Sequence, residues 1–119
     1  MAKEFRIYTR VWDEEAKDHH YAAVKVSGTA IGYELFAYKE QGRALYPELR
    51  WKIVDIKSGT AIPMIACPIK GALLRFASLA DCKDWVLNMP TVYKDKIDET
   101  RASPKYQQLC QDFANLPQE

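Results

Sequence analysis

Residues 74–86, LRFASLADCKDWV, contain the point at which the hydrophobic pattern of this chain changes its period. Up to about Ala77 the apolar residues mostly alternate with polar ones, as they do in half-buried β-strands. From Leu79 onward the apolar residues recur at helical spacing. Ser78 followed by Asp81 resembles a capping box, because a serine hydroxyl can accept a hydrogen bond from a free amide of the first helical turn. The pattern therefore predicts strands before Ser78 and helices after it.

Two or three helices are expected in the C-terminal part. The first runs from Leu79 to about Asn88 and ends before Pro90, and the second, weakly amphipathic, runs from Thr91 to about Arg101.

The last helix has the strongest signals. Ser103 is the expected N-cap and Pro104 fits the first helical turn. The apolar residues that follow lie at i, i+3, i+4 and i+7, and are Tyr106, Leu109, Cys110 and Phe113. We expect Phe113 to anchor this helix to the sheet.

The N-terminal part contains several strand-like segments, which are residues 5–12, 21–26, 50–57, 60–66 and 72–77. Ser58 and Gly59 separate two of them and predict a tight turn, in which glycine supplies a positive φ. Residues 30–41 fit either a strand or a helix, and the strand is favoured because the neighbouring segments are strands.

These patterns predict one α+β domain over residues 1–119. It would have an N-terminal twisted antiparallel sheet of about five or six strands, followed by two or three C-terminal helices packed on one face. With 119 residues, 48% of them hydrophobic, the chain is long enough for one core.

The charge and the N-terminus suggest the class of partner and the compartment. A formal net charge of +1 gives no global basic field of the kind that drives non-specific binding to nucleic acid. No signal peptide or apolar run of membrane-spanning length is visible, and three scattered cysteines form no disulfide framework. These features predict a cytoplasmic protein without membrane association.

The most specific candidate site is a row on one side of the first strand, in FRIYTRVW at residues 5–12. Phe5, Ile7 and Val11 are expected to face the core, so a row of alternating cations and rings would face outward. Residues of later strands would extend this surface. The candidate binding residues are Arg6, Tyr8, Arg10, Trp12, Tyr21, Lys25, Arg50 and Lys52.

Such a row is compatible with three uses. Arginine and aromatic side chains are enriched at the centres of protein interfaces. They also form the stacking platforms of proteins that bind single-stranded nucleic acid. They can equally be the water-facing side of a sheet, because their stems and rings cover apolar surface.

Signals for catalysis are weak. Residues 13–20, DEEAKDHH, supply carboxylates and imidazoles but no fixed ligand spacing, so we expect no metal and no cofactor. Cys82 and Cys110 fall on faces expected to be buried, which leaves Cys67 as the remaining candidate nucleophile, without an identifiable partner.

The sequence therefore predicts a non-enzymatic binding module, an adaptor or an inhibitor of a larger protein assembly, that uses an outer sheet face or an edge strand. A binder of single-stranded nucleic acid is the alternative, and a metal- or thiol-dependent enzyme is a remote one. The sequence does not indicate an oligomeric state.

Overall fold

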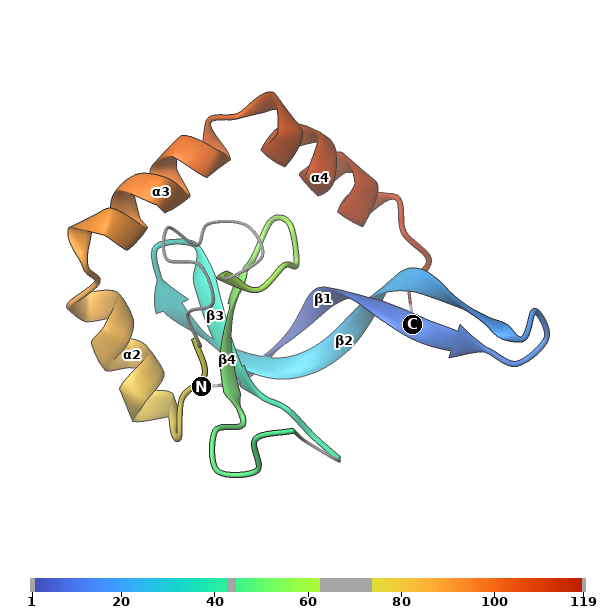
Figure 1. Ribbon diagram of the computed structural model, residues 1–119, viewed down its shortest axis with the longest axis horizontal. Coiled ribbons are helices and arrows are strands. Elements are labelled where there is room, and N and C mark those ends of the chain that lie inside the picture. The colour runs from blue at the N-terminus through green and yellow to red at the C-terminus, as the bar shows by residue number, and fades with distance from the viewer. Residues whose placement is uncertain (1, 43–44, 63–73, 119) are drawn as a thin grey trace.

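The computed structural model describes residues 2–42, 45–62 and 74–118, and shows a curled antiparallel sheet followed by helices (Figure 1). The strands are hydrogen-bonded to one another in sequence order and are β1 (Lys3–Asp13), β2 (Asp18–Gly32), β3 (Leu35–Lys39) and β4 (Trp51–Asp55). The helices are α2 (Leu79–Leu87), α3 (Thr91–Arg101) and α4 (Pro104–Ala114). The predicted α+β class and the order of strands before helices are confirmed.

The strand count was wrong, because the described residues form a sheet of four strands rather than five or six. Within the segment predicted over residues 60–66, Ala61 makes only an isolated bridge to Val54, and residues 63–66 lie outside the described part. Within the segment 72–77, Phe76 exchanges two backbone hydrogen bonds with Trp51 as a second isolated bridge, and residues 72–73 lie outside the described part. Phe76 cannot extend this pairing because the chain enters α2 three residues later.

Residues 30–41 are confirmed as mainly strand. They contain the end of β2, the whole of β3 and a two-residue turn between them. Tyr33 and Glu34 form this turn with φ of 57° and 56°, the positive values that a tight hairpin turn requires at both central positions.

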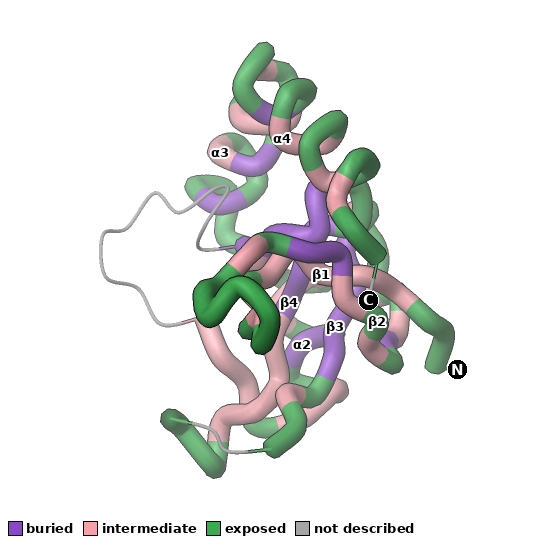
Figure 2. The backbone as a smooth tube through the Cα atoms, turned by 90° about the vertical axis from the view of Figure 1, so that its right-hand side faces the viewer, coloured by how far each residue is buried: buried purple, intermediate pink, exposed green. Residues whose placement is uncertain are grey.

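The two faces of the β3–β4 pair contact different parts of the chain, and Figure 2 shows that both strands consist largely of buried residues. Leu35, Ala37 and Ile53 face the helices and pack with Cys82 of α2 and Ile97 of α3. On the opposite face lie Phe36, Tyr38 and Val54, and the curled β1–β2 hairpin covers them with Phe5, Ile7 and Val26. The predicted inward orientation of Phe5 and Ile7 is confirmed.

The helices begin and end where the sequence predicts. The Ser78 hydroxyl accepts a hydrogen bond from the Asp81 amide, and the Ser103 hydroxyl accepts one from the Tyr106 amide. Each bond satisfies an amide that has no partner within its own helix.

The far end of the chain returns to the sheet beside β2. After α4, the carbonyl of Pro117 accepts a hydrogen bond of 2.9 Å from the Ala23 amide. Gln118 forms a parallel bridge with Ala23. The three helices therefore form an arch that starts near β4 and ends at the middle of β2 (Figure 1).

Candidate functional site

The predicted cation and ring row lies on one face of the β1–β2 hairpin. The strands pair so that Arg6 is opposite Lys25, Arg10 is opposite Tyr21, and Trp12 is opposite His19. Directly paired residues project from the same face of a sheet. Six of the eight candidate binding residues therefore share this face, and they are Arg6, Tyr8, Arg10, Trp12, Tyr21 and Lys25.

The inner half of this face is partly covered around Tyr8, which differs from the expected open row, although Lys25 remains exposed. The ring of Tyr8 stacks on that of Phe113 in α4 at a centroid distance of 6.1 Å, and the Tyr8 amide donates to the Gly59 carbonyl. The guanidinium of Arg6 donates to the Ala23 carbonyl at 3.2 Å. The Tyr8 ring is therefore half-buried against α4 rather than fully open to water, because the last helix docks on the side of the hairpin that the alternation leaves polar. Phe113 does connect α4 to the sheet, although its ring is only half-buried.

The outer half of the face remains exposed. Trp12 and Tyr21 keep 52% and 51% of their surface accessible, and Arg10 is also exposed. The Trp12 ring meets the His19 ring edge-on at 5.1 Å. We call Arg10, Trp12, His19 and Tyr21 the arm surface, because this end of the hairpin projects away from the helices (Figure 1).

The loop at the tip of the arm is organised by its own acidic residues. The Asp13 carboxylate accepts hydrogen bonds from the amides of Glu15 and Ala16. Glu14 binds Lys17 and accepts a hydrogen bond from the Trp12 indole, and these two bonds lower the pKa of the Glu14 carboxyl. Within the described part of the chain, no group of three or more His, Cys, Asp or Glu residues is arranged to hold a metal ion.

A second surface, which we call the basic hollow, lies on the face of β4 turned away from the helices. It has a volume of about 620 Å³. Two of the predicted binding residues, Lys25 and Lys52, line it together with Lys39 and Arg75, which the sequence reasoning missed. Arg50 is not part of its lining, since its guanidinium donates to the carbonyls of Glu40 and Gly42. Of the eight predicted residues, three belong to the arm surface and two line the basic hollow, while Tyr8 is partly covered by α4 and Arg6 and Arg50 donate to backbone carbonyls.

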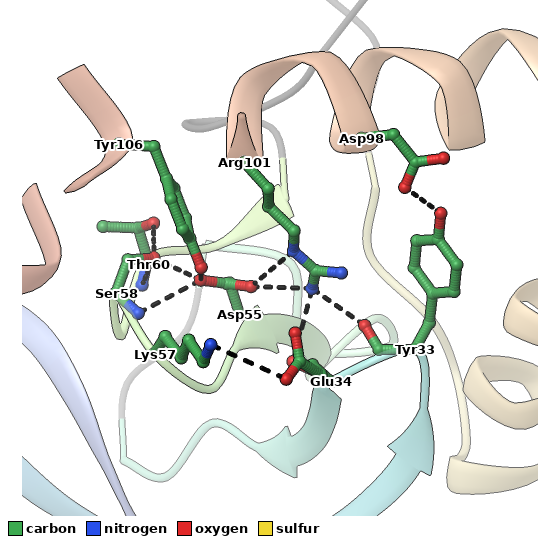
Figure 3. Close-up of polar contacts among 9 residues, drawn as sticks. All are labelled: Tyr33, Glu34, Asp55, Lys57, Ser58, Thr60, Asp98, Arg101 and Tyr106. Atoms are coloured by element: carbon green, nitrogen blue, oxygen red, sulfur yellow. Dashed lines mark hydrogen bonds and ion pairs between the residues drawn. The ribbon is translucent and has the colours of Figure 1, made fainter. Parts of the chain in front are cut away.

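A polar cluster around Asp55 joins the sheet to the helices (Figure 3). Arg101 approaches one carboxylate oxygen of Asp55 to 2.7 Å, while Tyr106 and Ser58 each donate a hydroxyl to the other oxygen at 2.7 Å. The Ser58 hydroxyl also lies 2.6 Å from that of Thr60.

The Asp55 cluster holds the structure together rather than presenting a binding site. Asp55 and Ser58 are fully buried, so no ligand reaches them from solvent. The sequence signal was an acidic residue at the end of the apolar strand WKIVD, which by itself looks like an ordinary polar position. Arg101 and Tyr106 could not be paired with it from the sequence, because they lie far along the chain.

The described thiols are poor nucleophiles. Burial raises the pKa of Cys82 to about 12 and also raises that of Cys110. A thiol must ionise in order to attack, and both remain protonated at neutral pH. Cys67, the candidate from the sequence, lies outside the described residues.

Comparisons with other proteins identify no relative: no family model, curated protein or solved structure matches this chain. No helix in the described part is long and apolar enough to cross a membrane. The geometry of the arm surface is therefore the basis for a functional argument.

Proposed function

We propose that this chain is a non-enzymatic binding module, an adaptor or an inhibitor within a larger assembly, that contacts a protein partner through the arm surface. The observation that carries this proposal is the pair of half-exposed rings, Trp12 and Tyr21, beside the exposed Arg10 at the end of a projecting hairpin. Tryptophan, tyrosine and arginine are the residues that most often dominate the binding energy of protein interfaces.

The charges at the arm favour protein over single-stranded nucleic acid. Arg10 is the one cation of the arm surface, and the adjoining tip carries four acids, Asp13, Glu14, Glu15 and Asp18. Lys17 at the tip is already paired with Glu14. With Glu14 and Lys17 offsetting each other, a strand of phosphates would meet the carboxylates of Asp13, Glu15 and Asp18 against one guanidinium, which opposes binding at this site. The protein's net charge of +1 supplies no compensating long-range attraction.

The proposal is tested with the double variant Arg10→Ala/Trp12→Ala. Native lysate, with and without nuclease treatment, is passed over the immobilised chain, and the retained proteins are quantified by mass spectrometry. We expect one or more retained proteins to be lost from the double variant. Truncation of an interface tryptophan weakens binding by about 30-fold or more when the ring lies at the centre of a contact.

The matched control is Leu87→Ala/Val92→Ala, which removes two other exposed apolar side chains, 81% and 50% accessible, from α2 and α3. It should retain the same proteins as the unmodified chain. Circular dichroism and thermal unfolding establish that both variants are folded. Retention that disappears with nuclease would indicate nucleic acid instead, and equal retention by both variants would refute the arm surface as the binding site.

A further inference from the structure

The hydrogen bonds at the middle of the β1–β2 hairpin show which of its backbone groups point outward. Tyr8 and Ala23 are paired, yet the Tyr8 amide donates to the Gly59 carbonyl and the Ala23 amide donates to the Pro117 carbonyl. In an antiparallel pair, residues of this kind do not exchange hydrogen bonds with each other, and their amides and carbonyls point to the two outer edges. Every second residue of β1 after Tyr8 therefore also presents its backbone groups at the outer edge.

Toward the tip of the arm, this outer edge of β1 is open. Its next two residues with outward backbone groups are Arg10 and Trp12, and neither forms a backbone hydrogen bond outside the hairpin within the described part of the chain. The pairing register runs from Lys3 to Asp13 without a shift, and residues 9–13, TRVWD, contain no proline. Bulges and prolines are two of the devices that prevent a strand edge from pairing with another chain. This segment has neither.

The sheet is only two strands wide in the arm. Pairing between β2 and β3 ends at Gly28 and Tyr38, so β2 pairs only with β1 from there to the tip (Figure 1). A two-stranded ribbon is marginally stable in water, and each added strand stabilises it. An extended segment at the open edge would therefore complete the arm.

A second copy of the same segment fits this edge in one register. A two-fold axis at Val11 places Val11 opposite Val11 and Arg10 opposite Trp12 of the other copy. Arg10 and Trp12 then exchange both of their outward hydrogen bonds, and the guanidinium lies beside the indole ring on a shared face. An axis at Arg10 would oppose two guanidinium groups, and an axis at Trp12 would oppose Val11 to the Asp13 carboxylate.

The outer edge of β2 is a poorer match for self-pairing. Its outward residues toward the tip are His19 and Tyr21, so the equivalent axis places His20 opposite His20. That pair offers neither an apolar contact nor opposite charges. Residues 117–118 already lie along this edge beside Ala23.

We propose that the chain forms a symmetric dimer through the outer edge of β1, with Val11 at the two-fold axis. The two arms together form four adjacent strands, and both arm surfaces lie on the same face of them. Only residues 9–13 of each copy take part, so the interface belongs to the small, weak class and the dimer is populated at high protein concentration. This proposal concerns the edge of the arm, whereas the proposed protein partner contacts its face.

The unmodified chain provides the first test. Sedimentation equilibrium from about 10 µM to about 1 mM should show a monomer–dimer equilibrium. Amide hydrogen exchange, followed by NMR, should slow at Arg10 and Trp12 as the concentration rises and stay constant at His19 and Tyr21. A chain that is monomeric at about 1 mM, or slower exchange at His19 and Tyr21 alone, would refute the proposal.

The variant Val11→Lys tests the register, because it places two ammonium groups opposite each other where Cα atoms are about 4.5 Å apart. We expect it to weaken dimerisation by about tenfold or more. Thr9→Lys is the matched control, since Thr9 is likewise half-buried on the same face of β1 but lies opposite Asp13 of the other copy. It should dimerise at least as well as the unmodified chain, and equal weakening by both variants would overturn the register. Val11 projects from the face opposite to the arm surface, so Val11→Lys leaves the residues proposed to bind a protein partner unchanged.

Cross-linking gives a readout that does not depend on a charge. Two cysteines at the axis lie within the Cα distance of a disulfide, so Val11→Cys should form a linked dimer with oxidised glutathione as the oxidant. In Thr9→Cys the two thiols are four residues apart along the paired strands, about 13 Å, and should not link. The unmodified chain is the blank for the native cysteines. Linkage of Thr9→Cys as fast as that of Val11→Cys would show random collision and refute the proposal.

Discussion

Gly59 occupies a position that no other residue can take without moving its neighbours. Its φ is +68°, in the left-handed region, and a Cβ there would lie 2.4 Å from the Phe113 ring and 2.9 Å from the Tyr8 amide nitrogen. The turn at Ser58 and Gly59 was predicted correctly, because glycine signals positive φ within a local stretch of sequence. The contact with Phe113 joins residues far apart in the chain and had no local signal.

The substitution Gly59→Ala should therefore be much more destabilising than a glycine replacement that affects φ alone. Gly42 is the matched control, because its φ is +75° and nothing lies within 4 Å of its would-be Cβ. We expect Gly42→Ala to lower the free energy of unfolding by about 1 kcal/mol through left-handed strain. Gly59→Ala should lower it by about 3 kcal/mol, because displacement of packed atoms adds to that strain. Urea denaturation measures both, and equal losses would show that Phe113 moves aside freely.

At the scale of elements, the Asp55 cluster connects β4 to α3 and α4. Arg101 extends the connection to the β2–β3 turn by donating to the Tyr33 carbonyl at 2.8 Å. Its guanidinium also lies over the Tyr33 ring, 5.2 Å from the centroid. One side chain of α3 therefore contacts two separate parts of the sheet.

The substitutions Asp55→Asn and Arg101→Met should each reduce the free energy of unfolding by about 3 kcal/mol or more, since each leaves a buried charge without its partner. The double variant should lose less than the sum of the two single losses, by about 1 kcal/mol or more, because the unpaired charge is then absent. Chemical denaturation of the four proteins completes the cycle. Strict additivity would mean that the two side chains do not depend on each other.

The sequence predicted the helices more accurately than the strands, because helix ends depend on local contacts and strand pairing does not. The sequence predicted the bounds of the helices to within one or two residues. Ser78 and Ser103 cap α2 and α4 through hydrogen bonds to amides only three residues along the chain, so the signal is local. The prediction of additional strands was wrong. Ala61 and Phe76 lie in segments with the alternating pattern of strands, but each forms only one isolated bridge. Pairing depends on where other strands lie, which periodicity does not reveal.

The candidate surfaces were predicted in part for the same reason. Alternation correctly placed the row containing Arg10 and Trp12 on one face of β1. It did not indicate that α4 covers Tyr8, nor that Lys25 and Lys52 line the same hollow with Arg75. Both facts depend on how the sheet curls and on where the arch of helices ends.

For the molecule as a whole, two buried phenols and a buried thiol make the free energy of unfolding depend on pH in the alkaline range. Burial raises the pKa of the Cys82 thiol and of the Tyr38 phenol to about 12, from ordinary values of 9.0 and 10.0. Burial and the hydrogen bond to Asp55 raise the pKa of Tyr106 as well. The unfolded chain therefore releases these protons at lower pH than the folded chain does.

The free energy of unfolding should accordingly be constant from neutral pH to about 9 and fall above it, by about 1.4 kcal/mol per pH unit for each group that ionises only in the unfolded state. Denaturation curves at a series of pH values test this expectation. In the double variant Cys82→Ala/Cys110→Ala, which removes both thiols whose pKa is raised, the decline should begin about one unit higher, near the ordinary pKa of tyrosine. A stability that is unchanged up to pH 11 would contradict the proton retention assigned to these groups.

The bond between Ala23 and Pro117 implies a hazard during folding. Until α4 has docked, the backbone amide at the middle of β2 has no acceptor at that edge, and an unpaired strand edge is a template for another chain. Contacts between distant segments form late, because a large loop must close first. Two copies of the chain that meet in this interval can pair β2 with β2, so aggregation should compete with folding more strongly as the protein concentration rises. We therefore expect residues 115–118 to limit self-association by occupying this edge of β2, a role that neither their composition nor their exposure indicates.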